Sequence, residues 1–132
     1  MDLDHRQLSL ILARGRAING LVLLIVPGLV GRALLGDVGG TPVSRALLRM
    51  VGVRDLVLGV GAITTLKEHT MDAEWVGMGA VADAIDGAAL LLTPGLPARS
   101  RLASFAGVGA AVSGILSARV LADERGPSEV DS

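Results

Sequence analysis

The chain contains no cysteine, and this absence excludes disulfide bonds, thiolate metal sites and cysteine nucleophiles. Aromatic side chains are nearly missing as well, since the 132 residues include one Trp, one Phe and no Tyr. A soluble core of this size normally uses more aromatic bulk, because each ring buries about 150–250 Å². The shortage of aromatic residues therefore argues against an ordinary soluble domain.

Charge and histidine are also scarce. Charged residues make up 19% of the chain, compared with roughly 25% in soluble domains. The net charge is −1, and the sequence lacks the basic stripe with interleaved aromatic residues that nucleic-acid binding requires. The two histidines, His5 and His69, have no second His or Cys at metal-ligand spacing. We therefore expect no nucleic-acid partner, no metal and no cofactor.

Small and aliphatic residues fill the sequence instead. Hydrophobic residues make up 51% of the chain, the mean hydropathy is +0.59, and there are 18 glycines. Glycine inside a helix costs roughly 1 kcal/mol in water, whereas in a bilayer it lets helix backbones approach closely. This composition favours a membrane protein.

Four apolar segments are separated by short clusters of helix-breaking and polar residues. They cover about residues 8–26, 43–66, 72–93 and 101–121. Each is long enough to cross a hydrocarbon core of about 30 Å, and the short loops imply antiparallel neighbours. We therefore predict an all-α fold, a four-helix antiparallel transmembrane bundle within residues 1–122, followed by a polar, disordered tail over residues 123–132.

Two details of this layout stay open. The short stretch 28–37 either lies along the membrane surface or extends the first span. Basic residues do not orient the bundle, because the positive-inside comparison is nearly even. The side of the termini would carry Arg6, Arg14, Arg16, Lys67, Arg119 and Arg125, and the other side Arg32, Arg45, Arg49, Arg99 and Arg101.

Charged residues inside the second and third segments are the most informative feature. Arg54 and Asp55 lie within the second, and Asp83 and Asp86 within the third. A charge at the centre of a span costs about 2.5–3.5 kcal/mol on insertion scales. The carboxylates share helix faces with glycines, namely Gly52 and Gly59 in the second segment and Gly79 and Gly87 in the third. Because glycine faces are where helices pack closely, we expect the two acidic faces to meet.

The basic partners of these carboxylates are predicted to be one or more of Arg16, Arg49 and Arg54. One interpretation is an ion-pair network that fixes the register of the helices. The other is a proton relay or polar pocket, in which Asp83 and Asp86 would share a proton in a dry site. An arginine between the two carboxylates would let both keep their charge, so the position of the arginines distinguishes the interpretations.

A ladder of small residues marks the fourth segment. Gly109, Ser113 and Ser117 recur at four-residue spacing, a pattern typical of helix-packing faces in membranes. We expect this face to pack inside the bundle, with contact against another subunit as the alternative.

The pattern G-x-R-D-L-x-L-G at Gly52–Gly59, combined with A-D-A-x-D at Ala82–Asp86, resembles an uncharacterised family of small bacterial four-helix membrane proteins. The resemblance extends from Arg16 to Leu121. It implies the four-helix membrane fold and a bacterial inner membrane, but no activity, because the family has none assigned.

The expected function is non-enzymatic. We predict a structural or accessory membrane subunit with a buried Arg/Asp network, whose partners are the lipid bilayer and either a second copy or a larger membrane complex. So short a chain leaves little room for a substrate cavity, which usually needs about 300 Å³ or more. The alternative is a small proton-coupled transporter or channel that uses the intramembrane carboxylates.

Overall fold

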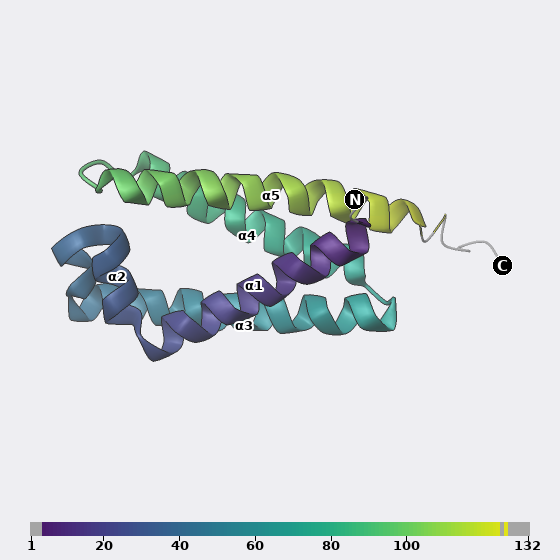
Figure 1. Ribbon diagram of the computed structural model, residues 1–132, viewed down its shortest axis with the longest axis horizontal. Coiled ribbons are helices and arrows are strands. Elements are labelled where there is room, and N and C mark those ends of the chain that lie inside the picture. The colour runs from purple at the N-terminus through teal and green to yellow at the C-terminus, as the bar shows by residue number, and fades with distance from the viewer. Residues whose placement is uncertain (1–3, 125, 127–132) are drawn as a thin grey trace.

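The computed structural model describes residues 4–124 and Gly126, and the described chain is helical without any strand (Figure 1). The elements are α1 (His5–Ile25), α2 (Pro27–Leu35), the 3₁₀ helix η1 (Gly36–Gly40), α3 (Pro42–Glu68), α4 (Asp72–Leu92) and α5 (Ala98–Glu124). The all-α prediction is confirmed. Long helices correspond to each of the four predicted segments, with ends that differ by a few residues.

Local sequence explains where the helices begin and end. Asp4 caps α1 by accepting a hydrogen bond from the Arg6 backbone N–H at 3.3 Å. Thr41 caps α3 in the same way, accepting from Ser44 N–H at 3.2 Å, and Pro42 occupies the first helical position. The tail predicted from residue 123 begins too early, because α5 continues through Glu124. Residues 125 and 127–132 of that tail lie outside the described part of the chain.

The stretch after the first segment forms α2 and η1 instead of extending α1. Pro27 lacks a backbone N–H and restricts the residue before it, so α1 ends at Ile25 and Val26 leaves the helical conformation. The chain then folds back on itself, with the backbones of Gly31 and Gly39 in direct contact. A methyl group on either glycine would collide with the carbonyl of the other. Since only hydrogen fits at both positions, these glycines fix the path between α1 and α3.

The long helices pack as two pairs. α1 lies mainly against α3, and α4 mainly against α5, with fewer contacts between the pairs. Within each pair the two helices run in opposite directions (Figure 1). The pairs meet through apolar side chains near the termini, where Leu66 and Leu121 are fully buried.

Glycines bring the helices of a pair into backbone contact. A Cβ atom on Gly52 of α3 would lie 2.8 Å from the Gly20 carbonyl oxygen of α1. One on Gly59 would lie 2.6 Å from the Ala17 backbone nitrogen. Both distances are shorter than van der Waals contact, so α1 and α3 sit this close only because these positions carry hydrogen. Gly52 and Gly59 are packing positions, but the prediction that their face meets the glycine face of α4 is wrong, because both pack against α1.

Large apolar side chains cover the outside of the molecule. The exposed ones include Ile18, Ile25, Val57, Ile85, Leu102 and Phe105, whereas the buried positions are largely Gly, Ala and Ser. Soluble proteins rarely expose contiguous apolar surface of this extent. Within the described residues, α1, α4 and α5 are long and apolar enough to cross a membrane. α3 is long enough as well but carries Arg54 and Asp55 near its middle.

The buried face of α5 differs from the predicted ladder. It consists of Ser100, Ser104, Ala111, Gly114, Ser117 and Leu121. Gly109 is exposed, with nothing within 4 Å of where its Cβ would be, and Ser113 is half-buried. The interpretation that this ladder packs inside the chain is therefore wrong for Gly109. Steps of four residues advance about 40° beyond a full turn, so a strict four-residue ladder drifts away from a contact that follows alternating steps of three and four.

The glycine contacts predict a large difference between two similar substitutions. Gly59→Ala should lower the free energy of unfolding by about 1–3 kcal/mol, because its methyl group meets the α1 backbone and the helices must separate. Gly109→Ala places the same methyl group in open space and should leave stability unchanged or slightly raised. Thermal unfolding of the purified proteins measures both. Equal stability of the two variants would contradict the close α1–α3 packing.

Candidate functional site

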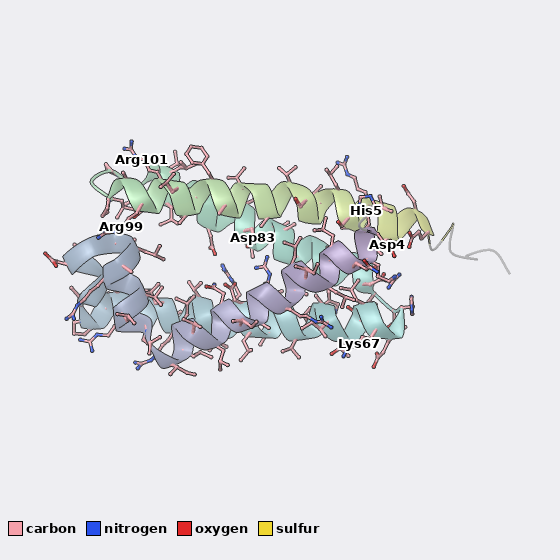
Figure 2. All side chains as sticks on the ribbon, viewed as in Figure 1. Asp4, His5, Lys67, Asp83, Arg99 and Arg101 are labelled. Atoms are coloured by element: carbon pink, nitrogen blue, oxygen red, sulfur yellow. The ribbon has the colours of Figure 1, made fainter. Side chains whose placement is uncertain are left out.

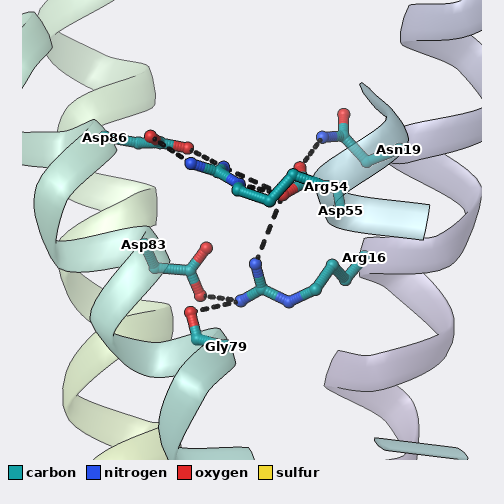
Figure 3. Close-up of polar contacts among 7 residues, drawn as sticks. All are labelled: Arg16, Asn19, Arg54, Asp55, Gly79, Asp83 and Asp86. Carbon is teal, nitrogen blue, oxygen red and sulfur yellow. Dashed lines mark hydrogen bonds and ion pairs between the residues drawn. The ribbon is translucent and has the colours of Figure 1, made fainter. Parts of the chain in front are cut away.

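The charged residues from the middle of the long helices meet between the two helix pairs. Figure 2 shows Asp83 at this level, between the layers, whereas Lys67, Arg99 and Arg101 lie toward the ends of the molecule. The close-up in Figure 3 shows the central cluster, which consists of Arg16 and Asn19 from α1, Arg54 and Asp55 from α3, and Gly79, Asp83 and Asp86 from α4. Both guanidinium groups belong to the α1–α3 pair.

Arg16 reaches across from α1 to α4. Its Nη2 forms an ion pair with the Asp83 carboxylate and donates to the Gly79 carbonyl at 2.9 Å. Its Nη1 lies 3.5 Å from Asp55 Oδ1. A Cβ atom on Gly79 would lie 3.2 Å from the Arg16 Nε. Gly79, predicted as a packing position, therefore makes room for the guanidinium group and supplies its carbonyl as an acceptor.

Asp55 is the centre of the cluster and its most buried charged group, with 8% of its side chain exposed. Its Oδ1 accepts from Arg54 Nη2 at 2.9 Å and faces Arg16, while its Oδ2 accepts from Asn19 Nδ2 at 3.0 Å. Both carboxylate oxygens thus have partners. A buried charge is tolerated when it is paired and hydrogen-bonded in this way.

Arg54 joins α3 to α4 through a fork-shaped contact. Its Nη1 donates to Asp86 Oδ1 at 2.9 Å, and its Nη2 binds Asp86 Oδ2. Two parallel bonds between a guanidinium and a carboxylate give both strength and a fixed geometry. This contact is the more open part of the cluster, with 34% of the Arg54 and 39% of the Asp86 side chain exposed.

Every carboxylate in the cluster therefore contacts a guanidinium group, and the two carboxylates on α4 bind different arginines. Each carboxylate on α4 thus has its own guanidinium partner, which is the arrangement that an ion-pair network requires. The Arg16–Asp83 and Arg54–Asp86 ion pairs, with Asp55 between the two arginines, connect the helix pairs, and we call this set of contacts the clasp.

A small cavity lies beside the Arg16–Asp83 contact. Its volume is about 30 Å³, and its lining includes Ser9, Arg16, Trp75 and Asp83. The Ser9 hydroxyl is buried and has no hydrogen-bond partner among the described residues. A cavity of this size holds about one water molecule, whereas binding sites for organic ligands are usually about 300 Å³ or larger.

The structure unites five of the six predicted polar residues and leaves out Arg49. Arg49 is exposed and forms no ion pair or side-chain hydrogen bond within residues 4–124. The reason is helical geometry: Arg49 precedes Asp55 by six residues, which places it about 120° around α3 from that carboxylate. Its inclusion among the candidate partners is therefore wrong. Gly87, predicted as a packing position, faces α5, where its Cβ would lie 3.1 Å from Val108 Cγ2.

The sequence patterns did not predict two features of the structure. Asn19 lies three residues after Arg16 and so shares its helix face, a spacing that would have identified it. The second feature is an ion pair near the termini, where Arg6 Nη2 lies 3.0 Å from the buried carboxylate of Asp72 and Nη1 donates to the Leu66 carbonyl at 2.9 Å. Both residues lie at helix ends in the sequence, where charges are ordinary, so no pattern distinguished them.

No group of three or more His, Asp or Glu side chains suited to a metal ion is found in the described part of the chain. Comparisons of the sequence with protein-family models and with curated proteins, and of the fold with solved structures, find no match. The resemblance based on Gly52–Gly59 and Ala82–Asp86 thus stays a prediction.

The clasp predicts that charge at Asp55 matters far more than charge at the surface. Asp55→Asn keeps the side-chain shape but removes the carboxylate between Arg16 and Arg54. Arg16 and Arg54 keep Asp83 and Asp86 as partners but lose the buried acceptor between them, so stability should fall by about 1–3 kcal/mol. Asp37→Asn, at an exposed carboxylate of η1, should change it by less than about 0.5 kcal/mol. Thermal unfolding measures both, and similar stabilities would show that Asp55 does not bridge the arginines.

Proposed function

We propose that the protein is a small integral membrane protein of the cell membrane, in which α1, α3, α4 and α5 form an antiparallel four-helix transmembrane bundle. The apolar exterior and the charged interior support this proposal. Exposed Ile18, Val57 and Ile85 belong to three different long helices, and each would face lipid. Arg16, Arg54 and the carboxylates that they bind lie between the helix pairs. Arg14 is exposed near the middle of α1, so its long side chain would have to extend along the helix to the membrane surface.

In the proposed bundle, α3 is the fourth membrane-spanning helix, beside α1, α4 and α5. Its 27 residues are about 40 Å long, enough to cross a hydrocarbon core of about 30 Å. Its central charges, Arg54 and Asp55, are bonded within the molecule. Charged residues in spans typically face a bundle interior and pair there, so composition alone underestimates the suitability of this helix for lipid.

The proposed role is structural, that of a membrane scaffold or accessory subunit that is not an enzyme. One observation carries it: Asp83 and Asp86 on α4 bind arginines on α1 and α3 respectively, so the charges connect the two helix pairs. The neighbouring cavity of about 30 Å³ suits a water molecule and no substrate. Such a clasp holds the pairs in one register, which is what a subunit needs in order to present a constant surface to a second copy or to a larger complex.

Membrane insertion predicts how the full-length protein behaves on cell fractionation. The chain should sediment with membranes, stay there through washes with high salt and alkaline carbonate, and dissolve only with detergent. The physical reason is the apolar exterior, which water does not solvate. Recovery of folded protein in the soluble fraction without detergent would contradict the proposal.

A proton-coupled transporter is the second candidate, and one observation favours it. The cluster contains three carboxylates but two guanidinium groups, so one negative charge has no cation of its own. Asp86, with 39% of its side chain exposed, is the carboxylate most open to proton exchange.

Proton flux into liposomes separates the two candidates. For a scaffold, liposomes with the wild-type protein, Asp83→Asn or Asp86→Asn should all be as proton-tight as empty ones. Asp83→Asn should still lower stability in detergent by about 1–3 kcal/mol, because Arg16 loses a charged partner. A transporter would instead give wild-type flux that disappears in variants which remain folded. Measurement of internal pH with a trapped dye, alongside thermal unfolding, decides between these outcomes.

A further inference from the structure

Charge is distributed unequally between the two ends of the molecule. Figure 2 shows Arg99 and Arg101 at one end, and Asp4, His5 and Lys67 at the other. The first end, here called the arginine end, is built from α2, η1 and the beginnings of α3 and α5. Its charged residues within 27–50 and 92–102 are Arg32, Arg45, Arg49, Arg99 and Arg101, with Asp37 as the single acidic group.

The opposite end, here called the terminal end, has the reverse balance. Its basic residues within the described chain are Arg6, Lys67 and Arg119, and its acidic ones are Asp4, Glu68, Asp72, Glu74, Asp123 and Glu124. Arg6 is further neutralised, since it lies 3.0 Å from Asp72 and 3.8 Å from Glu124. Positive charge without an acidic partner is therefore concentrated at the arginine end.

Backbone contacts hold the arginine end together. Arg99 Nη2 donates to the Arg32 carbonyl at 3.3 Å, and Ser100 Oγ donates to the Leu34 carbonyl at 2.5 Å. These bonds satisfy carbonyls at the end of α2 and fix the start of α5 beside it. Arg45 lies along Gly28, whose Cβ would be 3.1 Å from Arg45 Cδ. The three elements that carry the arginines, α2, α3 and α5, are thus in contact at this end of the molecule.

None of the five arginines forms an ion pair with another described residue. Arg45, Arg49 and Arg101 are exposed and form no ion pair among residues 4–124. Exposed apolar residues follow them toward the middle of the same helices, with Met50 at 68%, Leu102 at 69% and Phe105 at 64% exposure. Guanidinium groups above an apolar rim match a bilayer surface, where phosphate groups lie just outside the acyl chains.

We propose that the arginine end binds anionic phospholipid headgroups of the cytoplasmic leaflet, which places both termini on the opposite side of the membrane. This inference rests on the proposed membrane insertion and adds an orientation and a lipid partner to it. The sequence alone left the orientation open because Arg6 and Arg16 counted for the terminal side. In the structure both are engaged with carboxylates inside the molecule, so neither is available to a lipid phosphate.

Lipid titration tests the headgroup preference. The full chain, purified in a zwitterionic detergent, is titrated with phosphatidylglycerol or with phosphatidylcholine of the same acyl chains, while its unfolding temperature is recorded. Phosphatidylglycerol should stabilise it more strongly, and 0.5 M salt should weaken the effect. The combined variant Arg45→Gln/Arg49→Gln/Arg101→Gln should bind phosphatidylglycerol at least about tenfold more weakly, given the contribution of each arginine near an anionic surface.

A matched control removes the same amount of charge elsewhere. Arg14→Gln/Lys67→Gln/Arg119→Gln changes three exposed basic residues outside the arginine end and should keep the wild-type affinity. Three outcomes would overturn the inference: equal stabilisation by both lipids, an equal loss in the control, or equal stabilisation by inorganic phosphate, which would indicate a site for free anions. Because the protein would still need detergent for extraction in each case, failure here is distinguishable from failure of the proposed membrane insertion.

The absence of cysteine makes the orientation directly measurable. Ala98→Cys introduces a thiol at the arginine end and Thr70→Cys one at the terminal end, both at small exposed residues. In intact cells, a membrane-impermeant maleimide should label Thr70→Cys but reach Ala98→Cys only after permeabilisation. The reverse labelling pattern would overturn the assignment of the arginine end to the cytoplasmic side.

Discussion

The contact between two arginines of one helix pair and two aspartates of α4 determines how the halves of this molecule fit together. Coulomb attraction between unit charges grows several-fold when water is replaced by protein or lipid. The Arg16–Asp83 and Arg54–Asp86 ion pairs are partly shielded from solvent between the two helix pairs. Isolated charges there would cost more than the helices could recover by packing. The two helix pairs must therefore meet in the register that brings each guanidinium group to a carboxylate. Asp55 contacts both arginines and so connects them to each other.

Small residues make this contact geometrically possible. Gly52 and Gly59 bring α3 so close to α1 that Arg16 of α1 and Asp55 of α3 contact each other. Gly79 then leaves the space on α4 that the Arg16 guanidinium occupies. In a bilayer, where lipid tails are as apolar as leucine, helix association depends on such close packing and on interhelical polar contacts. Glycine and charge are thus two parts of the same interface.

The two ends of the molecule differ in how their charged side chains are paired. At the terminal end, Arg6 and Asp72 form an ion pair beside the buried Leu66 and Leu121, so the charge of Arg6 is again paired within the molecule. At the arginine end, α2 closes the structure through backbone carbonyls, and its neighbouring guanidinium groups remain outside. The central cluster and the terminal end have more acidic than basic groups, and the arginine end has more basic ones, so the molecule is polarised along its axis. For the proposed membrane protein, this uneven distribution of basic residues would set the direction of insertion.

Sequence patterns predict the helical class, the approximate ends of the long helices and the glycine-lined faces that carry Asp55, Asp83 and Asp86. These features are local, because helix period and capping residues such as Thr41 act within a few positions of the chain. The tertiary structure alone decided that Arg16 binds Asp83 while Arg54 binds Asp86, that Arg49 takes no part, and that Gly109 faces outward. The reason is physical: a helical pattern says which residues share a face, but the crossing and rotation of neighbouring helices decide what that face meets.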